Sequence, residues 1–194
     1  MNKRFSTKTL AGVGILTAIV IVLQFVAMYF LRFSMFSLTF VLVPIVIGAA
    51  LYGVWAGAWL GFVFGVVVLL SGDAAPFLAV NIPGTIATVL VKGTLAGAFS
   101  GLVYKLFSSK NPYLAVFAAA IVCPITNTGV FLIGCLLFFM DTIRTWAAGA
   151  GYENAGAYMM LGLAGINFII ELAVNMILAP VILRIIRTVR KNRS

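Results

Sequence analysis

The feature that most constrains this chain is an apolar run that continues almost without interruption from Leu10 to Leu183. Lys and Arg together number 13 and Asp and Glu number 4, and most of them lie in the breaks between apolar segments. A chain that is 63% hydrophobic and 9% charged cannot cover a water-facing surface with charge. The solvent of this chain is therefore a lipid bilayer.

The length of 194 residues limits how this membrane protein is organised. A membrane-spanning helix needs about 20 apolar residues, so about six spans fit with short loops and no soluble catalytic domain. We expect an all-α integral membrane protein with six transmembrane helices, forming a single membrane domain over residues 1–194. The expected spans are residues 9–31, 39–51, 54–70, 83–107, 113–140 and 158–183.

The distribution of charge predicts the orientation in the membrane. If both termini are cytoplasmic, most basic residues fall on the cytoplasmic side, as the positive-inside rule requires. Arg32 and Arg144 then lie outside, and Asp73, Asp141 and Glu153 lie in outward loops. The residues expected inside are Lys3, Arg4, Lys8, Lys105, Lys110, Arg184, Arg187, Arg190, Lys191 and Arg193.

Small residues recur at four-residue spacing in three of the expected spans, a pattern that lets helix backbones approach closely in lipid. One series runs through 54–70 and a second through 83–107, and close packing inside the protein is the simpler interpretation for both. The first span carries Gly14 and Ala18, with Ala11 one turn earlier. This face is a candidate docking surface for another protein. The two glycine series are Gly53, Gly57, Gly61 and Gly65, and Gly93, Gly97 and Gly101.

Ionisable residues inside the spans are more informative, because such groups are costly in a bilayer and usually face the protein interior. Lys92 lies in the fourth expected span and Glu171 in the sixth, at similar depths, so an ion pair between them is geometrically feasible. Asn167, Glu171 and Asn175 repeat every four residues and share one helical face. That face cannot point at lipid. A structural ion pair, contact with a ligand, and proton or ion coupling all remain open.

The fifth expected span adds an amide close to a proline. Pro124 removes a backbone hydrogen bond and can kink the helix near its middle. Asn127 and Phe131 share one face, combining a hydrogen-bonding group with an aromatic surface, as small-molecule sites do. Helix-to-helix hydrogen bonding by the asparagines is the competing interpretation.

The sequence lacks the residues that several classes of function require. The chain has no histidine, which removes histidine-based metal sites and Ser-His-Asp chemistry. No phosphate-binding loop motif is present, so ATP-driven transport would need an ATPase on another chain. The net charge of +9 belongs to segment ends, so we expect no nucleic-acid partner. We also expect no metal and no cofactor.

Taken together, these features resemble those of a known family. The relevant segments are a small-residue first helix, a glycine-rich stretch 44–65, Asn81-Ile82-Pro83 leading into Val91-Lys92-Gly93, and the segment 123–129, Cys-Pro-Ile-Thr-Asn-Thr-Gly. The chain resembles the substrate-binding S components of energy-coupling factor (ECF) vitamin transporters. The likeness covers essentially the whole chain and is strongest to the branch that binds folate, pantothenate, pyridoxine and cobalamin.

The resemblance implies a subunit of a prokaryotic cell-membrane importer that captures a small-molecule vitamin near the external face. The liganded subunit would then join a transmembrane coupling protein and two ATPase subunits, and topple so that its pocket opens inward. Gly14 and Ala18 match the small-residue motif with which the family's first helix docks on the coupling protein, and Ala11 extends it. Carried over to this sequence, the substrate-binding residues would be Arg32, Phe36, Asn81, Lys92, Asn127, Phe131, Asn167, Glu171 and, at a deeper position, Asn175.

Three other functions compete with this interpretation. In a self-sufficient secondary transporter or channel, Lys92 and Glu171 would gate or relay ions, which predicts ion-coupled flux without partners. A membrane-embedded enzyme would leave Glu171 without a catalytic companion. A purely structural subunit would explain the glycine series but not the charges within the spans.

Overall fold

The structure is a computed structural model that describes residues 7–30, 32–33, 36–37 and 40–191, without the side chains of residues 29–30, 32–33 and 36–37. The described part is almost entirely helical, as expected, with one hairpin of two short antiparallel strands. The elements in chain order are α1 (Thr7–Phe30), β1 (Arg32–Phe33), β2 (Phe36–Ser37), α2 (Leu42–Tyr52), α3 (Val54–Ser71), α4 (Ala75–Leu78), α5 (Ile82–Ser108), α6 (Pro112–Phe138), α7 (Met140–Gly149), α8 (Ala155–Ala157), the π-helix η2 (Tyr158–Gly165) and α9 (Ile166–Lys191).

The described residues contain 5 helices that are long and apolar enough to cross a membrane. They are Thr7–Met28 within α1, all of α3, α5 and α6, and the combined segment Ala155–Lys191. The second expected span, 39–51, corresponds to α2, which is apolar but has only 11 residues. Most of the residues of α2 are buried, so this short helix contributes to the protein core.

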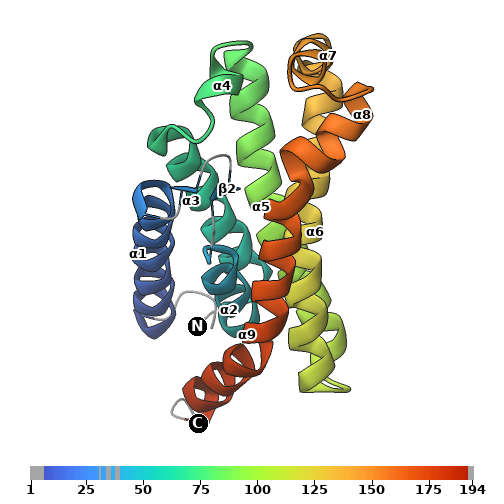
Figure 1. Cartoon of the computed structure of the whole chain (residues 1–194). Helices are drawn as coiled ribbons and strands as arrows, with labels where there is room; N and C mark the ends of the chain where they lie inside the picture. The colour runs from blue at the N-terminus through green and yellow to red at the C-terminus, as the bar shows by residue number, and fades with distance from the viewer. Residues whose placement is uncertain (1–6, 31, 34–35, 38–39, 192–194) are drawn as a thin grey trace.

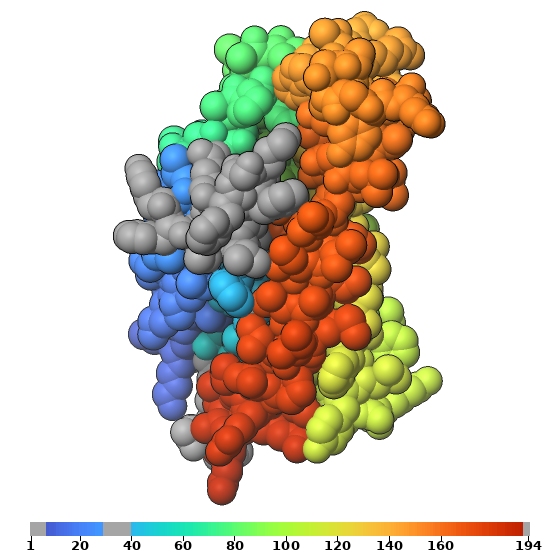
Figure 2. Space-filling view, viewed as in Figure 1, coloured from blue at the N-terminus to red at the C-terminus, as the bar shows by residue number. Residues whose placement is uncertain are grey.

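The helices form an elongated bundle, in which α1 lies at one edge and α9 runs obliquely along another side (Figure 1). The start of α1 and the end of α9 lie at the same end of the bundle, while α4 and α7 lie at the opposite end (Figure 1). The space-filling view shows the α4 and α7 regions as neighbouring projections at that opposite end (Figure 2). We refer to it as the α4–α7 end.

The glycine series bring α3 and α5 into backbone contact, which confirms the packing interpretation. A Cβ atom added at Gly61 would collide with the carbonyl oxygen of Gly93, and one at Gly57 would collide with that of Gly97. One turn further along, a Cβ at Gly65 would lie 2.8 Å from the Val89 carbonyl oxygen. Larger side chains here would force the two helices apart.

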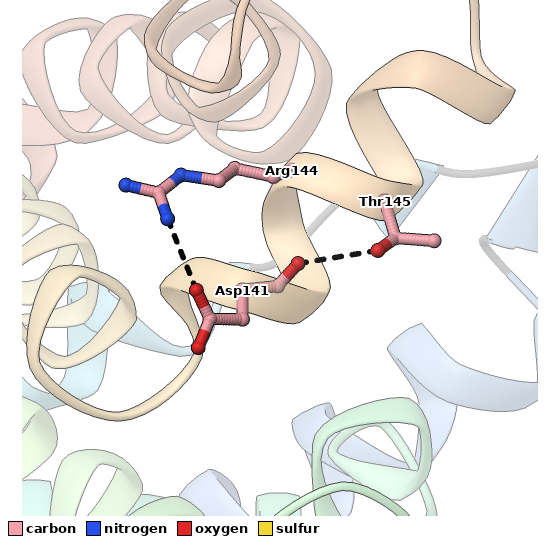
Figure 3. A network of polar contacts seen from close by, with 3 residues as sticks. All are labelled: Asp141, Arg144 and Thr145. Carbon is pink, nitrogen blue, oxygen red and sulfur yellow. Dashed lines mark hydrogen bonds and ion pairs between the residues drawn. The ribbon is translucent and has the colours of Figure 1, made fainter.

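The stretch from Asp141 to Asn154, predicted to be a loop, is largely helical in the structure. Its helix α7 buries Ile143 and Ala147, which are one turn apart and so lie on one face. The polar face carries an exposed ion pair in which Arg144 Nη1 donates to Asp141 Oδ1 at 3.0 Å (Figure 3). Thr145 Oγ1 donates to the Asp141 carbonyl oxygen at 3.2 Å. The polarity of this stretch therefore marks an amphipathic helix and not an irregular loop.

The last helix is longer than the predicted span 158–183. It begins with the π-helix η2 and continues in α9 as far as Lys191. Two arginines of its final turns contact aromatic rings of other helices. The guanidinium carbon of Arg187 lies 4.6 Å from the Tyr113 ring centroid, and that of Arg190 lies 5.5 Å from the Tyr104 ring centroid. These contacts hold the basic end of α9 against α5 and α6, where the sequence suggested only a tail.

Candidate functional site

A cavity of about 380 Å³ lies within the bundle. Its walls come from α1, α3, α4, α5, α6, η2 and α9, so segments from both ends of the chain contribute to it. The residues that line the cavity are Gln24, Phe64, Val68, Asp73, Ala74, Phe77, Thr85, Thr88, Val89, Lys92, Asn127, Thr128, Phe131, Phe139, Gly162, Leu163, Ala164, Asn167, Phe168 and Glu171.

Helix α5 presents one polar face to the cavity. Thr85, Thr88 and Lys92 line it, at spacings of three and four residues that place them on the same side of a helix. The helix starts at Asn81, whose side-chain oxygen accepts a hydrogen bond from the Gly84 backbone N–H at 2.9 Å. This N-cap fixes where α5 begins and hence which of its side chains turn inward.

The ammonium group of Lys92 lies between two aromatic rings. Its Nζ is 5.2 Å from the ring centroid of Phe131 and 5.9 Å from that of Phe64. The negative faces of such rings attract a cation. Glu171 and Asp73 also line the cavity and interact electrostatically with Lys92. The cavity thus combines one ammonium group with two carboxylates.

Two amides complete the polar wall on α6 and α9. Asn127 is buried on α6, and Asn167 lies one turn before Glu171 on α9. Neither Asn127 Oδ1 nor Asn167 Oδ1 has a hydrogen-bond partner among the described residues. Asn175, one turn beyond Glu171, is fully buried, and its Nδ2 donates to the Glu171 carbonyl oxygen at 2.8 Å.

Aromatic side chains enclose the cavity on the side of α4. The Phe77 ring makes edge-to-face contacts with Phe131, Phe139 and Trp146, at centroid separations of 5.5, 5.1 and 5.4 Å. This arrangement is favourable for aromatic quadrupoles. These ring contacts connect the short helix α4 to α6 and α7.

A hydrogen bond links α1 to the segment between α3 and α4. Gln24 is 1% exposed, and its Nε2 donates to Asp73 Oδ2. A carboxylate accepts but does not donate, so this bond fixes which end of the amide is the nitrogen. Gln24 lines the cavity, and its Oε1 is then left without a hydrogen-bond partner among the described residues.

The structure brings together five of the nine predicted substrate-binding residues around this cavity, namely Lys92, Asn127, Phe131, Asn167 and Glu171. Asn81 caps α5 and Asn175 binds a backbone carbonyl, and neither lines the cavity. The side chains of Arg32 and Phe36 lie outside the described residues.

Several lining residues were not among those predicted. Gln24 is a polar residue within an apolar span, so the argument applied to Lys92 and Asn127 would also have selected it. Asp73 was placed in an outward loop that could cover the site, but not in the site itself. The remaining side chains carry no local signal that separates them from ordinary packing residues; they include Thr85, Thr88, Phe64, Phe77, Phe139 and Phe168.

The three candidate docking residues lie on the outer face of α1. Ala11, Gly14 and Ala18 are all exposed, and a Cβ atom added at Gly14 would meet no atom within 4 Å. By contrast, a Cβ at Gly12 would collide with the Tyr52 hydroxyl. Gly12 therefore faces the bundle, and Gly14 faces away from it.

Comparison with known proteins identifies the family of this chain. Neither curated proteins nor solved structures give a match. A family model described as the ECF transporter, substrate-specific component, matches residues 8–183, which include every residue that lines the cavity. The chain therefore belongs to the family of substrate-specific components of ECF transporters.

Proposed function

We propose that this chain captures a water-soluble vitamin or related micronutrient in the described cavity and passes it to a separate coupling protein and two ATPases. As a member of its family, the chain is a substrate-specific membrane subunit of a transporter, and such components are not enzymes. The observation that carries the finer proposal is the cavity, in which Lys92, Glu171, Asn127 and Asn167 meet within an apolar bundle.

The size and the lining of the cavity support a small ligand. A volume of about 380 Å³ is near the lower end of the range of about 300–1,000 Å³ for small-molecule sites. Polar groups buried inside a membrane protein carry a large free-energy cost, and here they come from four helices and from Asp73 in the turn between α3 and α4. Among the vitamins bound by the family branch that the sequence resembles, a cavity of this volume favours compact ones over a corrinoid such as cobalamin.

The proposed orientation has six membrane-crossing segments, with α2 as the short one, and both termini in the cytoplasm of a prokaryotic cell. In its support, the first and last described helices begin and end at the same end of the bundle (Figure 1). The cavity is lined by α4, which lies at the opposite end. In this orientation the substrate enters from outside.

The proposed contact with the coupling protein is the outer face of α1, at Ala11, Gly14 and Ala18. Small exposed residues at this spacing allow a partner helix to approach the α1 backbone closely. The same helix supplies Gln24 to the cavity, so one element takes part in both proposed contacts.

Mass spectrometry of small molecules released on denaturing the detergent-purified protein tests the proposal. We expect a vitamin or related micronutrient in stoichiometric amount, because a high-affinity capture subunit retains its ligand through purification. If the protein is empty, thermal unfolding is repeated with a panel of water-soluble vitamins, one of which should raise the transition temperature.

Measurements of ion flux in liposomes that contain the chain alone test the competing function. Ion-coupled flux by the chain alone, with no ligand released and no vitamin that stabilises it, would replace the proposal with a self-sufficient transporter or channel based on Lys92 and Glu171.

A further inference from the structure

Four residues that line the cavity carry a side-chain oxygen that is buried without a hydrogen-bond partner among the described residues: Gln24 Oε1, Thr88 Oγ1, Asn127 Oδ1 and Asn167 Oδ1. They come from four different helices. Buried oxygens without partners are uncommon in folded proteins, since each loses its hydrogen bonds to water. Four of them around a single cavity indicate a surface that is completed by a bound molecule.

The Gln24 side chain indicates the hydrogen-bonding chemistry of this bound molecule. Its Nε2 already donates to Asp73, so the amide cannot be turned to offer a donor without losing that bond. Gln24, which lines the cavity, therefore offers its Oε1 as an acceptor. Asp73 and Glu171 add carboxylate oxygens to the same lining, and ionised carboxylates also only accept.

The remaining walls determine the shape of this partner. Phe64, Phe77, Phe131 and Phe139 surround the polar groups with aromatic surface. Such surface suits a flat ring, which packs by stacking or edge-to-face contact. Lys92 already lies between the rings of Phe64 and Phe131 and interacts with both carboxylates, which leaves it less suited to bind a ligand carboxylate.

We propose that the ligand is a compact nitrogen heterocycle bearing exocyclic amino groups, whose N–H donors satisfy the oxygens of Gln24, Thr88 and Asn127. This inference rests on the proposed function, because it names the substrate class of the same cavity. Aliphatic carboxylates such as pantothenate lack both the flat ring and the donor-rich edge.

Matched pairs of compounds test the proposal on the purified protein by isothermal titration calorimetry. Thiamine and oxythiamine differ by one exchange of a ring amino group for an oxo group. Pyridoxamine, pyridoxine and 4-pyridoxate carry an amine, a hydroxyl and a carboxylate at one position of the same ring. Pantothenate and biotin represent carboxylates without an aromatic ring. In whichever series binds, we expect the compound with the amino group to bind at least tenfold more tightly than its analogues without that group.

Two variants link that preference to the cavity oxygens. Gln24→Met and Thr88→Val keep side-chain size similar but remove the acceptor. Both should reduce the preference for the amino compound to less than threefold. Thr88→Val should also raise the unfolding temperature of the empty protein, because it removes a buried hydroxyl that has no partner. A merely structural threonine would give the opposite change in stability.

The outcomes separate this inference from the proposed function. Tightest binding by pantothenate, biotin or 4-pyridoxate, or equal affinity within the pairs, would overturn the inference and leave the proposed function standing. Binding of none of these compounds by a protein that still unfolds cooperatively, with no small molecule released on denaturation, would remove both.

Discussion

At the scale of single residues, burial in lipid explains why polar side chains meet in one cavity. Lys92, Asn127 and Glu171 belong to three different helices, yet all line the same space. None of them can face the bilayer without a large free-energy cost, so each turns toward the protein interior. Because the interior of a small bundle is narrow, residues of this kind at similar depth come together there.

Glu171→Gln and Asn127→Ala should each weaken binding of the released ligand about tenfold or more, since a hydrogen bond to a charged or buried group contributes about 1.5–3 kcal/mol. Calorimetric titration of the purified variants measures the affinity, and their thermal unfolding shows that the fold is intact. Glu153→Gln is the matched control, because Glu153 is exposed and does not line the cavity. Unchanged affinity in both variants would exclude these residues from the binding site.

The type of a residue and its position within a span were enough to predict part of the candidate site. Polar residues inside a span avoid lipid, which is why four of the predicted residues line the cavity, namely Lys92, Asn127, Asn167 and Glu171. Phe131 was predicted because it shares a helical face with Asn127, and it lines the cavity too. Asn81 and Asn175 have the same chemistry but satisfy backbone groups, at a helix start and along α9. Sequence spacing does not distinguish an asparagine that caps or bonds the backbone from one that lines a cavity.

At the scale of elements, the apolar helices were predictable, including the short helix α2, whereas the polar helix α7 and the π-helix η2 were not. The expected spans at 54–70 and 83–107 agree closely with α3 and α5. The polar stretch that forms α7 lacks hydrophobicity, so its helical periodicity was overlooked. No residue pattern predicted the π-helix η2, within which a Cβ atom added at Gly162 would collide with the ring of Tyr158.

Helix α1 has two faces with different chemistry. Val13, Val20, Gln24 and Ala27 are buried toward the bundle. The opposite face carries the exposed Ala11, Gly14 and Ala18 beside large exposed apolar residues such as Ile15. A helix that faced only lipid would not need the small residues, and this contrast supports a partner on the outer face.

Gly14→Leu and Ala18→Leu should leave ligand affinity unchanged and abolish assembly with a coupling protein. Both positions are exposed, and Gly14 has open space around it, so the added side chain causes no clash within the bundle. Co-purification with a coupling protein and its ATPases measures assembly. Ala87→Leu, at an exposed position of α5, provides the control for added bulk in the membrane. Normal assembly of both α1 variants would refute the docking face.

At the scale of the whole molecule, the placement of charge on the fold supports the proposed orientation. The loop between α5 and α6 and the end of α9 carry Lys110, Arg187 and Lys191, whereas Asp73, Asp141 and Glu153 lie in or beside α4, α7 and α8. These two groups of segments lie at opposite ends of the bundle (Figure 1). By the positive-inside rule, this distribution supports the proposed orientation, with the α4–α7 end outside the cell.

Cysteine labelling in intact cells tests this orientation. The native Cys123 and Cys135 are free and buried, and replacing both with alanine gives a cysteine-free background. Glu153→Cys in that background should react with a membrane-impermeant maleimide from outside, because Glu153 is exposed beyond α7. Ser109→Cys, in the exposed connection after α5, should react only once the membrane is permeabilised. The reverse pattern would place the cavity on the cytoplasmic side, where a capture subunit could not collect an external vitamin.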